Sequence, residues 1–263
     1  CGDLFLQDTL LRGAEEALKT VLEATKELDI LAAVGLPVRN KWTGKLYNCA
    51  AVIHKGEIWG LIPKTYLPNY GEFYEQRWFA SGGGKDALEE LCGAQVPMDP
   101  NLLFQCDTLP DLVIGVEICE DLWVAEPPSN HLAQNGATLI LNLSASNELV
   151  GKSGYRRQLV TGQSGRLVCG YVYADAGEGE STTDLVFTGH NMIAENGSLL
   201  SERRFQTGLT ISEVDVSRLV YERRRMTTFP GTACLDCPRL SFPLPVTETK
   251  LTRYVSPNPF VPD

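Results

Sequence analysis

Cys119 has the setting of a nucleophile. It follows the apolar run of residues 112–118, which indicates a buried strand, and it precedes a short polar stretch that must turn. A thiol at the end of a buried strand, beside a turn whose backbone N–H groups face a developing oxyanion, suits acyl transfer through a thioester. The same position also suits an unreactive core cysteine, since buried thiols often act as small apolar side chains.

The charges near Cys119 set a condition on this chemistry. Glu117, Glu120 and Asp121 lie within two residues of the thiol, and negative charge raises a thiol pKa. A reactive Cys119 therefore needs a nearby cation or a dedicated base. Lys64 is the candidate cation, because it ends an apolar strand between two prolines, although a solvated surface lysine is the ordinary alternative. The segment after Lys64 adds carboxylates and aromatic walls, from Tyr70, Glu72, Phe73 and Glu75.

Three predicted strands end at polar residues. The first is the second half of a β-hairpin at residues 46–53 and 57–62, with Gly56 in its turn, and it leads to Lys64. The second covers residues 112–118 and leads to Cys119, and the third covers residues 137–143 and leads to residues 144–146. We expect the three ends to meet at one rim of the fold.

The remaining patterns predict an α/β layered fold. Apolar residues at helical spacing indicate an amphipathic helix over residues 9–28, and a short apolar run predicts a buried strand at residues 30–37. Further strands are expected at residues 167–174, in a hairpin of residues 186–193 and 198–200, and at residues 207–216, which lead into a short helix near residues 217–225. Helices between strands favour α/β layering over a sandwich of sheets alone.

The composition fits one large soluble domain. Of the 263 residues 43% are hydrophobic, which is enough for a large core. The net charge of -10 at pH 7 argues against nucleic-acid binding, which needs a concentrated basic face. No apolar stretch approaches the roughly 18–20 residues of a membrane-spanning helix. Eight cysteines are too few for a disulfide scaffold, so a reducing, cytoplasmic setting is expected.

Three other signals predict no additional site. The glycine-rich residues 81–86 do not have the spacing of a phosphate-binding loop, and they predict a surface loop. Cys234 and Cys237 have the spacing of a metal-ligand pair, but no second pair matches them, so no metal site is predicted. The three histidines are expected to be structural or exposed rather than catalytic; they are His54, His131 and His190.

Four segments of the chain resemble the nitrilase, or carbon–nitrogen hydrolase, superfamily. They are IPKTYLP at residues 62–68, YGEFYE at residues 70–75, GVEICED at residues 115–121 and NLSAS at residues 142–146. Among the branches of that superfamily they are most similar to the glutaminase domains of glutamine-dependent NAD synthetases, as is the opening CGDLF at residues 1–5. The resemblance covers nearly the whole chain, and the four motifs occur in the family's order.

This resemblance implies a nitrilase-like four-layer αββα sandwich and a catalytic triad of glutamate, lysine and cysteine. In that arrangement Cys119 attacks the carboxamide carbon, and Lys64 stabilises the tetrahedral intermediate together with backbone N–H groups. A supporting acid falls at Glu72 or Glu75, and both are candidates. Positions that line the glutamine pocket of this branch match Tyr70, Phe73, Glu120 and Ser146.

One member of the implied triad lies outside the sequence. The resemblance places the general-base glutamate on a strand a few residues before Cys1, so we expect the chain alone to be nearly inactive. Residues 1–253 correspond to the glutaminase domain, and the proline-rich residues 254–263 resemble a linker toward a synthetase domain. ATP and deamido-NAD are expected to bind only there, and the glutaminase domain needs no cofactor and no metal.

The resemblance also implies partners, and two alternatives stay open. L-Glutamine is the expected substrate, the synthetase domain of the same polypeptide is the expected acceptor of ammonia, and a homo-oligomer is expected. One alternative is a stand-alone amidase or nitrilase that acts on another amide, against which the linker argues. The other is a catalytically inactive assembly domain, which applies if the natural chain lacks the upstream glutamate.

Overall fold

The first sheet is built on the predicted hairpin. In the computed structural model, which describes residues 2–83, 87–180, 184–230, 237–246 and 249–257, β2 (Leu46–His54) and β3 (Glu57–Pro63) are antiparallel neighbours. Lys55 and Gly56 in their turn both have positive φ angles, 49° and 79°, which matches the twist of a tight hairpin. The remaining strands give the order β1-β2-β3-β5-β4, with β1 (Leu31–Arg39), β4 (Ala87–Leu91) and β5 (Ala94–Met98). The hairpin prediction is confirmed.

The second sheet has seven strands in the order β11-β10-β9-β8-β7-β6-β12. At its centre β7 (Val113–Ile118), β8 (Leu139–Ser144) and β9 (Gly170–Asp175) are parallel, so their carboxyl ends lie at one edge. Every residue of β7 is buried, as expected for a parallel strand covered on both faces. The outer strands are β6 (Leu103–Cys106), β10 (Asn191–Glu195), β11 (Ser198–Arg203) and β12 (Arg239–Phe242).

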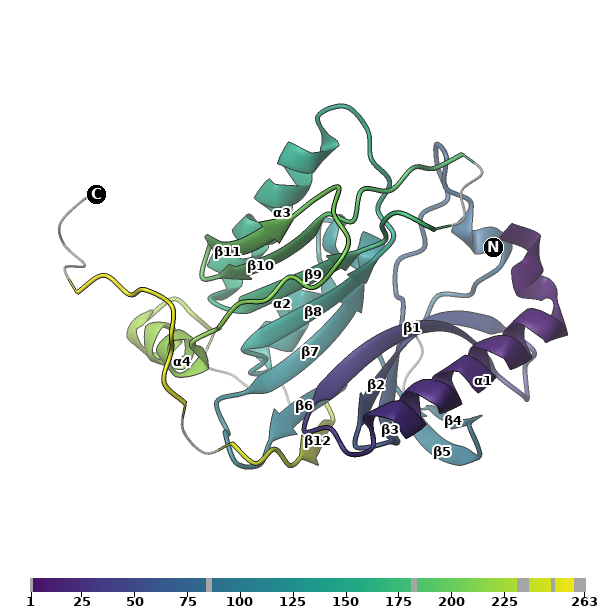
Figure 1. The fold of residues 1–263 in the computed structure, drawn as a ribbon, viewed down its shortest axis with the longest axis horizontal. Coiled ribbons are helices and arrows are strands. Elements are labelled where there is room, and N and C mark those ends of the chain that lie inside the picture. The colour runs from purple at the N-terminus through teal and green to yellow at the C-terminus, as the bar shows by residue number, and fades with distance from the viewer. Residues whose placement is uncertain (1, 84–86, 181–183, 231–236, 247–248, 258–263) are drawn as a thin grey trace.

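Three of the helices cover the outer faces of the two sheets (Figure 1). α1 (Asp8–Thr25) packs on β1, while α2 (Pro128–Gln134) packs on β7 and α3 (Lys152–Leu167) packs on β9 and β10. The fourth helix, α4 (Val216–Arg225), matches the short helix expected near residues 217–225. None of the helices in the described part of the chain is both long and apolar enough to cross a bilayer.

Three apolar cores separate the four layers. Leu18 of α1 packs in a cluster with side chains of the five-stranded sheet, and Leu132 and Val160 of α2 and α3 pack in another with the seven-stranded sheet. The third core lies between the sheets, where Val52 of β2 and Val116 of β7 belong to one cluster. The four-layer αββα sandwich implied by the resemblance is therefore the observed fold.

Two predicted strands differ from the structure. The strand predicted at residues 207–216 does not form, because residues 207–215 lie in no strand and α4 begins at Val216. The first strand of the hairpin predicted at residues 186–193 begins only at Asn191. The preceding backbone bonds elsewhere, because the carbonyl of Val186 accepts from the N–H of Glu148 and the carbonyl of Thr188 accepts from the N–H of Phe205. Of the sequence predictions, the one on Cys234 and parts of those on residues 1–5, 81–86 and 254–263 lie outside the described residues.

Candidate active site

Cys119 stands on a sharp turn at the end of β7. It opens the 3₁₀ helix Cys119–Leu122 and has a φ angle of 48°, a left-handed conformation that is uncommon for a residue other than glycine. The side-chain Oδ1 of Asn142 accepts a hydrogen bond from the backbone N–H of Cys119, at 3.0 Å. The neighbouring parallel strand β8 therefore holds the strained backbone of the candidate nucleophile.

Buried polar groups fix the orientation of Asn142. Its Nδ2 donates to the hydroxyl of Tyr171 at 3.1 Å, and that hydroxyl donates to Glu117. Glu117 also accepts the backbone N–H of Ser129 at 2.8 Å. Asn142, Tyr171 and Glu117 are each at most 1% exposed, so every donor and acceptor in this series of hydrogen bonds must have a partner. The amide oxygen of Asn142 is thereby directed at Cys119.

A second carboxylate secures the same turn. Asp121 accepts the backbone N–H of Ile118 at 3.0 Å and that of Tyr66 at 2.8 Å, which joins the end of β7 to the segment after β3. Burial raises the pKa of Asp121 to about 7, against the effect of the two N–H donors. Because Glu117 and Asp121 both accept hydrogen bonds that hold this turn, we interpret the two carboxylates as structural groups.

Lys64 directly follows β3 and is held by Glu75. Its Nζ lies 2.5 Å from Oε2 of Glu75, and the other carboxylate oxygen accepts from Nδ2 of Asn48 at 2.8 Å. The side chain of Lys64 is 3% exposed and that of Glu75 is 13% exposed, so the pair is shielded from solvent. Burial acts to lower the pKa of Lys64, but the charges of Cys119 and Glu75 outweigh it and the pKa is raised. Lys64 is therefore a fixed cation and not a base at neutral pH.

The thiol of Cys119 faces this cation. Burial raises its pKa above the ordinary value, while the charge of Lys64 and hydrogen bonds from Ser144 and the backbone of Ala145 act to lower it. The ends of β3, β7 and β8 thus meet as the sequence predicted, with Lys64 and Ser144 both beside Cys119. A dedicated base is still required to remove the thiol proton, because these contacts leave the pKa raised.

The two candidate acids, Glu72 and Glu75, occupy different positions. Glu75 lies on Lys64, as described above, whereas Glu72 accepts a hydrogen bond from Nδ2 of Asn147 at 2.5 Å. Hydrogen bonds from its own backbone N–H and from Asn147 lower the pKa of Glu72. Of the two acids, only Glu75 forms the ion pair with Lys64.

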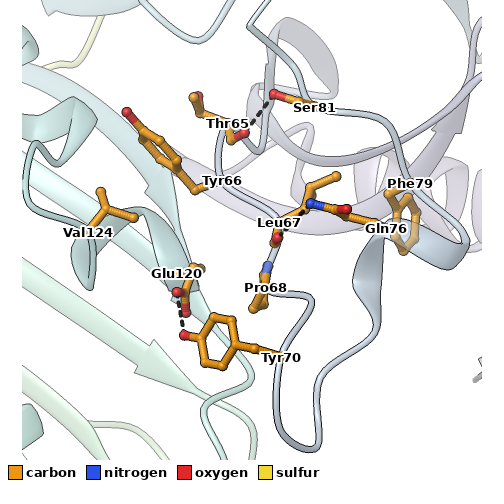
Figure 2. Close-up of a pocket in the computed structure, with 10 residues that line it drawn as sticks. All are labelled: Thr65, Tyr66, Leu67, Pro68, Tyr70, Gln76, Phe79, Ser81, Glu120 and Val124. Atoms are coloured by element: carbon orange, nitrogen blue, oxygen red, sulfur yellow. Dashed lines mark hydrogen bonds between the residues drawn. The ribbon is translucent and has the colours of Figure 1, made fainter.

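An open hollow of about 490 Å³ adjoins this centre and is lined partly by Glu120 and Tyr70 (Figure 2). The hydroxyl of Tyr70 donates to Oε1 of Glu120 at 2.6 Å, which joins two segments of the chain in the lining of the hollow. Cys119 and Lys64 do not line the hollow, whereas Glu120, the residue after Cys119, does. The carboxylate of Glu120 is placed to meet a positively charged group of a substrate.

Lys152 is a site residue that the sequence reasoning missed. It begins α3, and its Nζ lies 5.5 Å from the ring centre of Phe73 and 5.1 Å from that of Trp123. The same Nζ donates to Oδ1 of Asn147, which also bonds Glu72. The pKa of Lys152 is lowered by burial and by the charge of Arg156, and the charges of Cys119 and Glu72 only partly oppose this shift. The available signal was a basic residue shortly after the NLSAS segment.

Ser146, the last predicted pocket residue, lies beneath the surface. It is 3% exposed, and its backbone N–H donates to Asp175 while its hydroxyl oxygen accepts from Arg156.

Among the described residues, no group of three or more histidine, cysteine, aspartate or glutamate side chains is arranged to hold a metal ion. Whether the chemistry needs a metal or a cofactor stays a prediction.

Comparison with known proteins assigns the class. A family model for carbon-nitrogen hydrolases matches residues 4–224, which is most of the chain. The carbon–nitrogen hydrolase from Helicobacter pylori has the same fold, with a TM-score of 0.64 at 17% identity over 82% of this chain and 73% of that one. The chain belongs to the carbon–nitrogen hydrolase family.

Within that family the relatives point in one direction. Glutamine-dependent NAD(+) synthetase from Mycobacterium tuberculosis is 42% identical over 271 residues, covering 99% of this chain and 40% of that protein. The structure of a glutamine-dependent NAD(+) synthetase from Cytophaga hutchinsonii aligns with a TM-score of 0.66 and 34% identity, over 80% of this chain and 33% of that one. The chain therefore spans less than half the length of the synthetases it matches.

Proposed function

We propose that this chain is the glutamine-hydrolysing domain of a glutamine-dependent NAD synthetase. The observation that carries the proposal is the buried ion pair of Lys64 and Glu75 beside the thiol of Cys119, at the ends of three strands. A lysine that stays protonated acts as an electrophilic group, which suits the developing negative charge of amide hydrolysis. The similarity to full-length synthetases over almost the whole chain selects glutamine as the amide donor.

The reaction runs through a thioester on Cys119. A base takes the thiol proton, sulfur bonds to the carboxamide carbon, and the carbon–nitrogen bond then breaks as the leaving nitrogen receives that proton and departs as ammonia. Water, deprotonated by the same base, cleaves the thioester and releases glutamate. The N–H of Cys119 is already bonded to Asn142, so Lys64 and other N–H groups of the turn stabilise the oxyanion.

The rest of the whole-protein activity follows from the same proposal. The base is a glutamate encoded before Cys1, and residues 254–263 lead to a synthetase domain that binds ATP and deamido-NAD and uses the ammonia in a ligase reaction. We assign the assembled protein to the cytoplasm, as its cysteine content indicates, and to a homo-oligomeric state, as the resemblance implies. The glutaminase step itself requires no metal or cofactor.

Ammonia release tests the proposal directly. The protein to use is the extended chain, meaning this chain together with the residues encoded upstream of Cys1. It should hydrolyse glutamine in preference to asparagine and to simple aliphatic amides such as acetamide. Preference for an aliphatic amide would instead establish a stand-alone amidase. No hydrolysis of any amide, with Cys119 unreactive toward a glutamine-analogue diazoketone, would favour an inactive assembly domain.

The charges near the candidate nucleophile suit the two ends of a free amino acid. Glu120, which lines the hollow and accepts from Tyr70, forms an acceptor for an ammonium group. Lys152, which does not line the hollow, is a half-buried cation 5.5 Å from the ring centre of Phe73. A zwitterion needs one partner for each charge, and an unpaired charge in a partly dry site is costly. We assign the α-ammonium of glutamine to Glu120 and its α-carboxylate to Lys152.

Exchanging single charges should separate these two contacts. Lys152→Met is expected to lower kcat/KM about 10- to 100-fold for glutamine and for glutaramate, which lacks the amine, because a hydrogen bond to a charged group is lost. γ-Aminobutyramide, which lacks the carboxylate, should be affected far less. Glu120→Gln should show the reverse pattern, and Lys152→Arg should retain most activity. Equal losses on all three amides would contradict the assignment of the charges.

A further inference from the structure

A series of buried hydrogen bonds crosses three neighbouring strands and ends at the candidate nucleophile. Glu117 of β7 and Asn142 of β8 are partners in register, and Tyr171 of β9 precedes the partner of Asn142 by two residues. Because side chains alternate along a strand, these three lie on one face of the sheet, where Tyr171 packs in a cluster with side chains of α2 and α3. Glu117 and Tyr171 take no part in the reaction described above.

Every proton in this series is donated in the direction of Glu117. The N–H of Cys119 donates to Oδ1 of Asn142 at 3.0 Å, and Nδ2 of Asn142 donates to the hydroxyl of Tyr171 at 3.1 Å. That hydroxyl donates to Oε1 of Glu117, while Oε2 accepts from the backbone N–H of Ser129 at 2.8 Å. An ionised carboxylate only accepts hydrogen bonds, so Glu117 fixes the direction of the whole series.

The contacts of Glu117 agree with the ionised form. Burial raises its pKa, and hydrogen bonds from Tyr171, Ser129 and Asn142 act against that rise. The hydroxyl of Ser129 accepts from Nε2 of Gln163 at 2.8 Å, so the proton of that hydroxyl can point at Glu117. All of these groups donate, whereas a protonated Glu117 would need one of them to accept its proton. The observed directions therefore require the carboxylate.

An amide in place of this carboxylate would reverse the series. In Glu117→Gln one of the two oxygen positions becomes an NH2 group, which donates. If that group faces the N–H of Ser129, two donors meet. If it faces Tyr171, the hydroxyl proton of Tyr171 turns to Asn142, whose amide must rotate to present its oxygen. The N–H of Cys119 then faces the NH2 group of Asn142 and loses its acceptor.

Cys119 depends on this acceptor because of its backbone conformation. Its φ angle is 48°, and a residue other than glycine stays there only where its surroundings hold it. The preceding N–H, that of Ile118, is held by Asp121 at 3.0 Å, and the bond from Cys119 to Asn142 holds the next one. Without that bond the turn can relax, and the sulfur moves relative to Lys64, whose charge acts on the thiol.

We propose that Tyr171 and Glu117 are positioning residues for the nucleophile, which orient Asn142 so that its oxygen holds the N–H of Cys119 and the sulfur stays beside Lys64. This inference rests on the proposed function, since it concerns the same thiol. Neither residue touches the substrate. Both act through Asn142, so they affect the rate of the chemical step and not the binding of the amide.

Steady-state kinetics of the extended chain with glutamine test the inference. Tyr171→Phe removes one oxygen and keeps the ring in the core, so kcat is expected to fall about ten-fold while KM stays within about two-fold. Glu117→Gln should lower kcat at least as much, because it reverses the series. In the double variant kcat should be no lower than in Glu117→Gln alone, since the hydroxyl proton that rotates Asn142 is then absent.

Alkylation of Cys119 by iodoacetamide gives a second readout, which needs no turnover. Lys64 acts to lower the pKa of Cys119, so a sulfur that has moved away from Lys64 should react with a pH profile shifted to higher pH in Tyr171→Phe. Val160→Ala is the matched control, because Val160 is buried in the same core cluster as Tyr171. It should lower Tm but leave kcat and the pH profile of alkylation unchanged.

Three outcomes overturn the inference and leave the proposed function intact. They are an unchanged kcat in Tyr171→Phe, fully additive losses in the double variant, and an equal fall of kcat in Val160→Ala, which would assign the effect to the stability of the core. If Tyr171→Phe does not fold, Glu117→Gln supplies the same comparison of kcat with KM. Failure of the wild-type extended chain to hydrolyse glutamine would contradict the proposed function itself, and the alkylation profile of Tyr171→Phe would still test the positioning of Cys119.

Discussion

Cys119→Ala is expected to abolish ammonia release from glutamine in the extended chain, by more than about a thousand-fold in kcat. The effect is this large because the thioester cannot form without the sulfur, and no other nucleophile lies at the end of β7. The same substitution should abolish labelling by a glutamine-analogue diazoketone, read by mass spectrometry of the intact protein and its peptides. Folding should be retained, since alanine fills most of the same space.

The other cysteines supply the control for this experiment. Cys49, Cys106 and Cys169 are fully buried, and burial raises the pKa of both Cys49 and Cys169, so these thiols should not react. Among the cysteines that the structure describes, Cys92 is partly exposed and is the relevant competitor. Cys92→Ala should leave both hydrolysis and labelling unchanged. Labelling that persists in Cys119→Ala and disappears in Cys92→Ala would show that the wrong nucleophile has been assigned.

The parts of the site that the sequence predicted are those at strand ends. An apolar run followed by a polar residue marks both the strand and the point where its chain leaves the sheet, which identified Lys64 and Cys119 before any geometry was known. Their meeting at one rim was also predicted from the strand ends, whereas the packing of two sheets face to face, on which that meeting depends, came from the resemblance to a family. The choice between Glu72 and Glu75 depended on the fold, because only the structure brings Asn48 and Lys64 to one of them.

α3 shows why the rest could not be predicted. The helix has sixteen residues, yet its buried face includes polar side chains, among them Arg156, Gln163 and Ser164. Such a face has no apolar periodicity, so the strongest sequence signal of a helix is missing. Gly165 is also required for close packing, because an added Cβ would lie 3.2 Å from the backbone of Gly197. Lys152 was missed with the helix that it begins.

Glu75→Gln and Lys64→Met should both impair hydrolysis, for related reasons. Lys64→Met removes the cation that meets the oxyanion, with an expected loss in kcat of about 10²- to 10³-fold. It also leaves Glu75 buried without its partner, which should lower the free energy of unfolding by roughly 3 kcal/mol. In Glu75→Gln the side chain has a single oxygen that accepts hydrogen bonds, whereas Asn48 and Lys64 each donate to a separate oxygen of Glu75. Lys64 should therefore lose its fixed position, and kcat should fall about ten-fold or more. Glu72→Gln should cost less, because Glu72 does not contact Lys64.

Alkylation of Cys119 by a small reagent such as iodoacetamide separates the two roles. Lys64 acts to lower the pKa of Cys119, so Lys64→Met should shift the pH profile of alkylation to higher pH. Glu75 acts to raise that pKa, so Glu75→Gln should shift the profile to lower pH and speed alkylation at neutral pH. The two variants therefore move thiol reactivity in opposite directions while both lower kcat. Parallel shifts would mean that Glu75 acts on the thiol only by holding Lys64, and that its own charge has no influence on Cys119.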